Sequence, residues 1–130
     1  MNQEQLKILN EYIKMGIFPI LLEDISASTI QGATILKADC DDVLLSGHYE
    51  NICYVPPKWY IELSKQDAPI LVIDNINKIS KEEQRKFVEI LKYKKVSTFQ
   101  LPSNCMIFVT CYNLKEYPLD EDVYSLMVHI

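Results

Sequence analysis

The residues with the clearest chemical potential follow a short apolar run. Residues 70–73 are all aliphatic and lead into Asp74, where an enzyme that hydrolyses nucleotides would hold its metal ion with a carboxylate. In such an enzyme a glutamate that polarises water commonly comes next, but here the next residue is Asn75. An amide accepts no proton near neutral pH and cannot act as a general base. We therefore expect Asp74 to cap the turn after a buried strand, and we assign no catalytic residue.

The cysteines and histidines show no metal-binding or disulfide pattern. No two cysteines are spaced as C-x-x-C, and neither histidine lies near a cysteine at the spacing of zinc ligands. We expect no metal centre, and we interpret the thiols as buried and reduced, as in a cytoplasmic protein. The residues concerned are Cys40, Cys53, Cys105 and Cys111, with the isolated His48 and His129.

Length and composition indicate one ordinary globular domain. The chain has 130 residues, of which 48% are hydrophobic, and we treat residues 1–130 as a single domain. Its 13 basic and 18 acidic side chains give a net charge of −5, which argues against a dedicated nucleic-acid-binding protein. No apolar run approaches the ~20 residues that cross a bilayer, and the first residues lack the pattern of a signal peptide. We expect a cytoplasmic protein that does not enter the membrane.

Short apolar runs alternate with helical patterns along the chain, which is typical of an α/β fold with a mostly parallel sheet and helices on both faces. The runs at 69–74 and 105–110 should be central in a sheet of roughly four or five strands. Apolar residues at helical spacing predict a helix over 2–15 that ends near Gly16. Ser80 and Glu83 predict a capping box at the start of another helix. Residues 24–54 show no clear period.

From residue 54 onward the order of features is more specific. "YVPPKWYIEL" is followed by "PILVIDNINKISKEEQRKFVEILKYKKVSTFQLPSNCMIFVTCYN" and then by "LDEDVYSLMVHI". This order resembles the AAA+ ATPases, in particular their MoxR-like branch. The resemblance implies a three-layer fold like that of P-loop NTPases, here without the helical lid domain of the family.

The resemblance also assigns former roles to individual residues. Asp74 matches the Walker B aspartate, and Asn75 stands in place of the catalytic glutamate. Asn113 matches the sensor-1 asparagine, which in the family helps to orient the attacking water, although an asparagine there is equally typical of a turn. Gln84 and the pair Leu101-Pro102 match further family positions, whereas the arginine before the last strand is absent. We expect Asp74 and Asn113 to lie near each other at the carboxyl ends of their strands.

The phosphate-binding loop of the family is missing. Aligned without gaps, G-x-x-x-x-G-K-[ST] falls on residues 23–30, which contain neither glycine nor lysine and begin with Glu23 and Asp24. In a second alignment residues 34–39 are the second strand and 40–47 the short helix after it, so that the loop and its helix are deleted. Both alignments remove the phosphate anchor. We therefore expect no nucleotide cofactor, with Asp74, Asn75 and Asn113 as vestigial positions.

The helix after Ser80 carries a concentration of positive charge. Residues 78–95 hold seven basic and three acidic side chains, in a chain of net charge −5. We expect Lys81, Arg85 and Lys92 to be exposed, and we regard them as candidates for docking a partner. The opposite side of the helix should bury Phe87, Ile90 and Leu91. The alternative is a solvated helix face with i,i+3 and i,i+4 ion pairs.

These observations predict a catalytically inactive AAA+-like domain that acts as a protein-interaction or regulatory module. The expected partner is another protein, either an active ATPase of the family or a second copy of the chain. One alternative is a weak nucleotide-binding ATPase that uses Asp74 and an unconventional loop at residues 26–29. A second is a nucleic-acid accessory protein that binds through residues 78–95.

Overall fold

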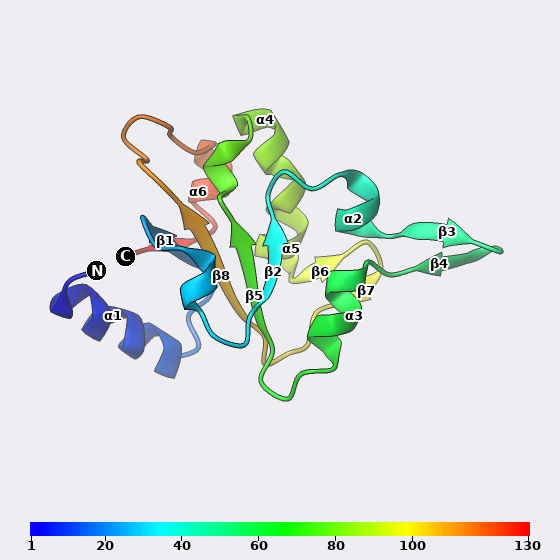
Figure 1. Cartoon of the computed structure of the whole chain (residues 1–130), viewed down its shortest axis with the longest axis horizontal. Coiled ribbons are helices and arrows are strands. Elements are labelled where there is room, and N and C mark those ends of the chain that lie inside the picture. Colours follow the sequence, from blue (N-terminus) through cyan, green and yellow to red (C-terminus); the bar gives the residue numbers. More distant parts are fainter.

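The computed structural model describes all 130 residues, and its centre is a five-stranded parallel sheet in the order β2–β5–β8–β1–β9 (Figure 1). Ile73 of β5 lies opposite Val109 of β8, and Leu21 of β1 lies opposite Val109 on the other side. The prediction of an α/β fold with a mostly parallel sheet is confirmed, and the two strands expected to be central are both interior. The strands are β1 (Ile20–Glu23), β2 (Thr34–Lys37), β5 (Ile70–Asp74), β8 (Met106–Cys111) and β9 (Val128–His129).

Alternating side chains of the strands divide the core between the two faces of the sheet. Leu71, Ile73 and Ile107 belong to the larger cluster, together with residues from helices on that face. Val72 and Phe108 belong to a smaller cluster on the opposite face. This alternation follows from the two-residue period of a strand, and it explains why the strands read as continuous apolar runs. The α-helices that contribute to the larger cluster are α2 (Asp42–Ser46), α3 (Lys58–Ser64), α5 (Val88–Tyr93) and α6 (Glu121–Tyr124), and α4 (Lys81–Gln84) precedes α5 on the same side of the chain's core.

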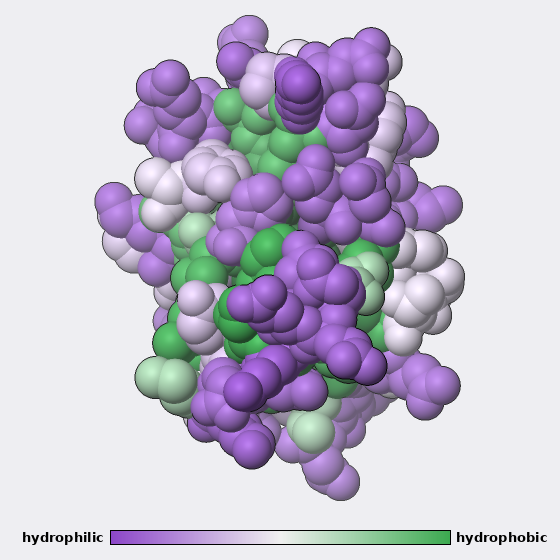
Figure 2. All heavy atoms as spheres, turned by 90° about the vertical axis from the view of Figure 1, so that its left-hand side faces the viewer, coloured by the Kyte–Doolittle hydropathy of each residue, from purple (hydrophilic) through white to green (hydrophobic).

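The smaller cluster is covered by α1 (Gln3–Lys14), whose Leu9 and Ile13 pack against it. Asn2 and Gln5 form a reciprocal capping box at the start of this helix, which satisfies two backbone N–H groups that a helix start leaves free. The helix ends as predicted, because Gly16 adopts a φ of 69° just beyond it. The side of the molecule that carries α1 is largely hydrophilic at its outermost atoms, with apolar atoms visible in the recesses between them (Figure 2). No helix is both long and apolar enough to cross a membrane.

The helix predicted after Ser80 is present but broken. The Ser80 hydroxyl accepts a hydrogen bond from the backbone N–H of Glu83 at 3.2 Å, which is half of the expected capping box. A 3₁₀ turn over Arg85–Phe87 separates α4 from α5, so the prediction of one continuous helix was wrong. The exposure pattern is confirmed nevertheless: Phe87, Ile90 and Leu91 are buried, whereas Lys81, Arg85 and Lys92 are exposed.

The segment without a clear sequence period, residues 24–54, contains a 3₁₀ turn (Ala27–Thr29), strand β2, a short helix and a hairpin. Helix α2 (Asp42–Ser46) is followed by an antiparallel hairpin of β3 (His48–Glu50) and β4 (Cys53–Val55). The turn of this hairpin has no glycine, and a glycine-containing dipeptide is the strongest short-range signal for a hairpin. A second small hairpin, β6 (Lys95–Val96) with β7 (Phe99–Gln100), follows α5.

Candidate functional site

The crevice between β1 and β8 is where this sheet would bind a ligand. From β1 the chain crosses to β2 at one edge of the sheet, whereas from β8 it continues to β9 at the other edge. Open α/β sheets bind ligands at such a switch point, outside the carboxyl ends of the strands. Asp74 ends β5, and Asn113 follows β8, its neighbour. The expectation that these two residues share the carboxyl edge of the sheet is confirmed.

The connection from β1 to β2 offers no phosphate-binding loop. Residues 24–33 contain only a 3₁₀ turn, Ala27–Thr29, and Ala27 is buried against the smaller core cluster. The next elements are β2 and then α2, which are the strand and short helix of the second alignment. No helix follows β1, so no helix N-terminus presents free backbone N–H groups toward the crevice.

The crevice is bridged by hydrogen bonds within the protein. Oδ1 of Asp24 accepts a hydrogen bond from the backbone N–H of Asn113 at 3.1 Å. Oε2 of Glu23 accepts one from the backbone N–H of Leu114 at 3.0 Å. The side chain of Asn113 turns to Glu116, to which its Nδ2 donates at 2.8 Å, and Asn113 itself has a left-handed φ of 47°. Asn113 therefore acts as a turn residue whose backbone N–H and side-chain N–H are already paired.

The side chain of Asp74 is also hydrogen-bonded within the protein. Its Oδ1 accepts a hydrogen bond from Oγ1 of Thr110 at 2.9 Å, and this Thr110 oxygen accepts another from the backbone N–H of Asn75 at 3.0 Å. Asn75 has a left-handed φ of 57°, which asparagine tolerates better than most residues. Both residues thus close the end of β5 onto β8. The Asp74 carboxylate therefore bonds to Thr110 of β8 and not to the backbone of the turn after β5.

The depression that remains at this edge has no basic residue in its wall. Its volume is about 350 Å³, and two carboxylates, from Asp24 and Asp74, face it. These carboxylates repel phosphate oxygens, which carry the same negative charge. Nucleotide sites hold phosphates with positively charged or N–H groups instead. The full lining is Asp24, Ile25, Ser26, Asp74, Asn75, Cys111 and Tyr112.

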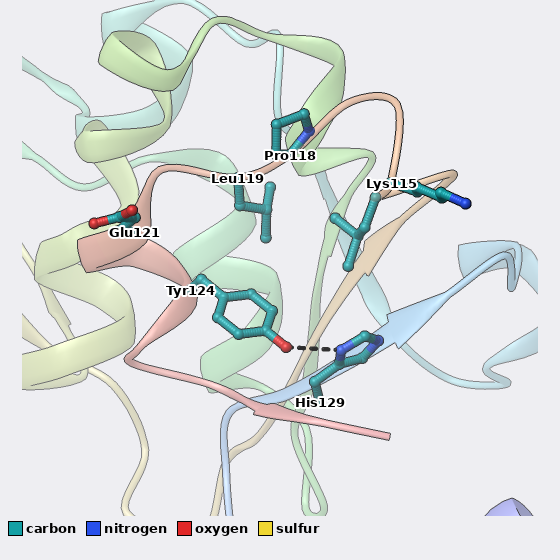
Figure 3. A pocket seen from close by; sticks show the side chains of 7 residues that line it. Lys115, Pro118, Leu119, Glu121, Tyr124 and His129 are labelled. Carbon is teal, nitrogen blue, oxygen red and sulfur yellow. Dashed lines mark hydrogen bonds between the residues drawn. The ribbon is translucent and has the colours of Figure 1, made fainter.

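A chain of contacts joins Glu23, His129 and Tyr124 beside the crevice, and Figure 3 shows its hydrogen bond between Tyr124 and His129. Nε2 of His129 is 3.3 Å from Oε1 of Glu23, and Nδ1 of His129 is 2.9 Å from the hydroxyl of Tyr124. Because the carboxylate can only accept, a neutral His129 ring with its hydrogen on Nε2 would direct that hydrogen toward Glu23 and leave Nδ1 to accept the phenol O–H. Sequence reasoning missed this chain, because His129 meets Glu23 only through the pairing of β9 with β1.

This chain borders a pocket of about 410 Å³ with a mainly apolar interior. The side chains of Lys115 and Glu121 point away from the Tyr124–His129 pair (Figure 3). The pair can pass a proton between phenol and imidazole, but no nucleophile or second polar group faces it from the opposite wall. The lining is Leu114, Lys115, Pro118, Leu119, Glu121, Tyr124 and His129.

A groove between α5 and α6 brings together two of the three docking candidates. Arg85 and Lys92 line it with Val88 and Leu126, and its volume is about 500 Å³. Lys81 is exposed but lies outside the groove. The groove therefore combines two apolar side chains with two cations, and Asp122 and Ser125 complete its lining.

Arg85 is held by two acids of the segment that it faces. Its guanidinium pairs with Asp122 and lies 3.8 Å from Asp120. The hydrogen bond to Asp122 is the main cause of a raised Arg85 pKa, followed by the charge of Asp120. Buried Gln84 reinforces this contact, since its Oε1 accepts a hydrogen bond from the backbone N–H of Asp120 at 2.8 Å. Lys92 makes no ion pair within the chain and is the freer cation of the groove.

The four thiols are free, but they are not all buried. Burial raises the pKa of Cys105 to about 11, and burial with the nearby charge of Glu23 raises the pKa of Cys111 to about 12. Cys53 is exposed on β4, so the prediction of buried thiols was wrong for this residue. The hairpin that exposes it was not predicted.

Comparison with models of known protein families and with curated proteins gave no match.

Proposed function

We propose that the chain is a catalytically inactive AAA+-like domain of the MoxR-like type that acts as a protein-interaction module. The observation that carries this proposal is the bridged crevice, in which Glu23 and Asp24 bind the backbone that follows β8. A nucleotide would have to break both hydrogen bonds and place its phosphates beside carboxylates, without a lysine or a helix N-terminus to compensate.

The test of inactivity is calorimetric titration with Mg·ATP and with ADP. We expect no binding tighter than a Kd of about 1 mM, which corresponds to a binding free energy of about −4 kcal/mol. Micromolar binding, or release of phosphate that depends on Asp74, would favour the alternative of an unconventional ATPase.

The groove between α5 and α6 supports the interaction role. Its two apolar side chains, beside Lys92 as the cation without an internal ion pair, are suited to a protein segment that carries apolar side chains and an acid. Charged groups at the rim of an interface mainly raise the association rate and make it sensitive to salt. The same groove is less suited to a nucleic-acid backbone, because Asp122 lies within it and Asp120 lies beside Arg85. We therefore favour a protein partner over nucleic acid.

Retention on immobilised DNA and RNA at low salt tests the nucleic-acid alternative. We expect little retention and no steep dependence of it on salt concentration. A steep dependence would report the release of counterions from neutralised phosphates. A steep salt dependence that is abolished by Lys92→Glu would favour the accessory-protein alternative.

A further inference from the structure

The hairpin of β3 and β4 presents bare apolar side chains at one end of the molecule. It extends at the right-hand end of the long axis in Figure 1, away from the sheet. Ile52 at its tip is fully exposed, at 101%, and Tyr49 is 77% exposed. Isolated exposed apolar residues are ordinary, but these two belong to one short projecting element.

The backbone at the tip is unfavourable for the residue that it carries. Asn51 and Ile52 have φ values of 49° and 63°, and they link the paired residues Glu50 and Cys53. A two-residue turn of this kind is normally built with glycine at its second position, because a β-branched side chain is disfavoured at positive φ. Nothing within the chain packs on Ile52 to offset this strain, and unrelieved strain of this kind often marks a functional contact.

The base of the hairpin is firmly held. The Tyr54 hydroxyl donates to the carbonyl of Ser46 and lies 3.0 Å from Oγ of Ser97. Its ring stacks on Phe99 with centroids 5.6 Å apart. A Cβ on Gly47 would lie 2.1 Å from the carbonyl oxygen of Val55, so only glycine fits beside β4. The exposed tip is therefore preorganised, which lowers the entropy lost on binding.

The charge nearest the tip is that of Glu50, whose carboxylate lies 3.6 Å from Nε2 of His48. Glu50 precedes the turn, and the exposed Asp41 and Asp42 lie at the start of α2. Within α2, Val43 and Leu44 are also exposed, at 59% and 54%. A matching partner surface offers apolar side chains beside a cation that is free to pair with Glu50.

The chain itself carries such a surface in the groove lined by Arg85, Val88, Lys92, Asp122, Ser125 and Leu126, where Asp122 pairs with Arg85 and Lys92 is the cation without an internal ion pair. The hairpin points away from α5 and α6 (Figure 1), so one molecule does not fill its own groove. We propose that the hairpin tip of one copy docks in this groove of a second copy, with Ile52 on Val88 and Leu126 and with Glu50 facing Lys92. This inference rests on the proposed role as an interaction module but is independent of catalytic inactivity.

The contact joins two different surfaces, so it is heterologous. Each copy in a pair still has one free tip and one free groove, and further copies can add until the assembly closes into a ring or grows as a chain. Association should therefore increase continuously with protein concentration and should weaken with salt.

The decisive variant is Ile52→Gly. If the tip docks on a second copy, association should weaken while stability holds; if Ile52 matters only within its own hairpin, association should not change. Glycine relieves the strain of the left-handed turn, so the melting temperature should stay the same or rise. Loss of the apolar anchor should weaken association about tenfold or more. The measurement is sedimentation velocity over a series of protein concentrations at low salt, with melting recorded on the same samples.

Ile8→Ala is the matched control, since Ile8 is an exposed isoleucine on α1, far in sequence from both surfaces. It should leave the sedimentation profile unchanged. A charge exchange tests the register: Glu50→Lys and Lys92→Glu should each weaken association, and the double variant should restore it in part. Cys53, exposed beside the tip, should react more slowly with a thiol reagent as the wild-type protein is concentrated.

A wild-type protein that stays monomeric at every concentration would overturn self-docking, as would association that Ile52→Gly leaves intact. Neither result would touch the prediction that Mg·ATP does not bind. Conversely, micromolar ATP binding with unchanged self-association would overturn the inactive-domain proposal and leave the docking contact standing.

Discussion

The backbone N–H of Asn113 donates a hydrogen bond to Oδ1 of Asp24 at 3.1 Å, across 89 residues of sequence. The bond joins the end of β1 to the turn after β8, at the switch point of the sheet. This arrangement holds the edge of the sheet together without a ligand.

Replacing Thr110 with valine should destabilise the fold. The substitution keeps the shape of the side chain but removes the donor to Asp74 and the acceptor for the N–H of Asn75. Leaving such partners unpaired in a buried place typically costs about 1–3 kcal/mol. Chemical denaturation measures the change. Thr29→Val is the control, because its hydroxyl bonds the Ser26 carbonyl at an exposed site, and equal losses for the two variants would contradict this account.

Asn77→Ala should loosen the segment after β8. The buried side chain of Asn77 donates to the carbonyls of Tyr112 and Tyr117 and accepts from the N–H of Tyr112. We expect a loss of about 2–3 kcal/mol in the free energy of unfolding, with faster amide hydrogen exchange in residues 112–118. Asn104→Ala removes one exposed hydrogen bond, to Asp67, and serves as the control. Unchanged exchange in this segment would show that other contacts hold it.

The contacts of His129 with Glu23 and Tyr124 predict its tautomer. Neutral His129 should carry its hydrogen on Nε2, because Glu23 can only accept there. Nitrogen-15 NMR of the imidazole distinguishes the two tautomers. Glu23→Gln should reduce the preference of His129 for the Nε2–H tautomer, since the amide can donate as well as accept. His48 is an internal comparison, because its Nε2 lies 3.6 Å from Glu50 at an exposed site, and a predominant Nδ1–H form of His129 would refute the assignment.

The two buried thiols predict a loss of stability in alkali. Their pKa values are raised from 9.0 to about 11 for Cys105 and about 12 for Cys111. Above pH 9 the unfolded thiols ionise while the folded ones keep their protons. Their contribution to stability is therefore complete below pH 9 and falls as pH rises toward 11–12, by at most about 1.4 kcal/mol per pH unit for each thiol.

Chemical denaturation between pH 8 and pH 11, a range chosen to span roughly this window, measures that slope. Cys111→Ala should reduce the slope, whatever its effect at neutral pH, and Cys53→Ala should leave it unchanged because Cys53 is exposed. Equal slopes for wild type and Cys111→Ala would contradict the role of this thiol.

Local sequence patterns determined those features that depend on neighbouring residues. The apolar runs before Asp74 and through Thr110 predicted two interior strands, because residues buried on both faces need not alternate. The helical spacing after Ser80 predicted which of Phe87, Ile90, Arg85 and Lys92 would be buried or exposed. It did not predict the 3₁₀ turn between α4 and α5. Over so short a segment, the apolar spacing of a 3₁₀-helix cannot be told from that of an α-helix.

Tertiary structure alone decided the contacts across the sheet. Glu23 meets His129 because β9 pairs with β1, and Asp24 meets Asn113 because β1 lies beside β8. Strand order depends on which packing of the whole chain buries the most apolar surface while pairing its polar groups, and no local period encodes it. The hairpin tip is a further case in which tertiary contacts decide. Asn51 and Ile52 form a turn that their own backbone preferences disfavour, and the anchoring of Tyr54 on Ser46 and Ser97 imposes this turn.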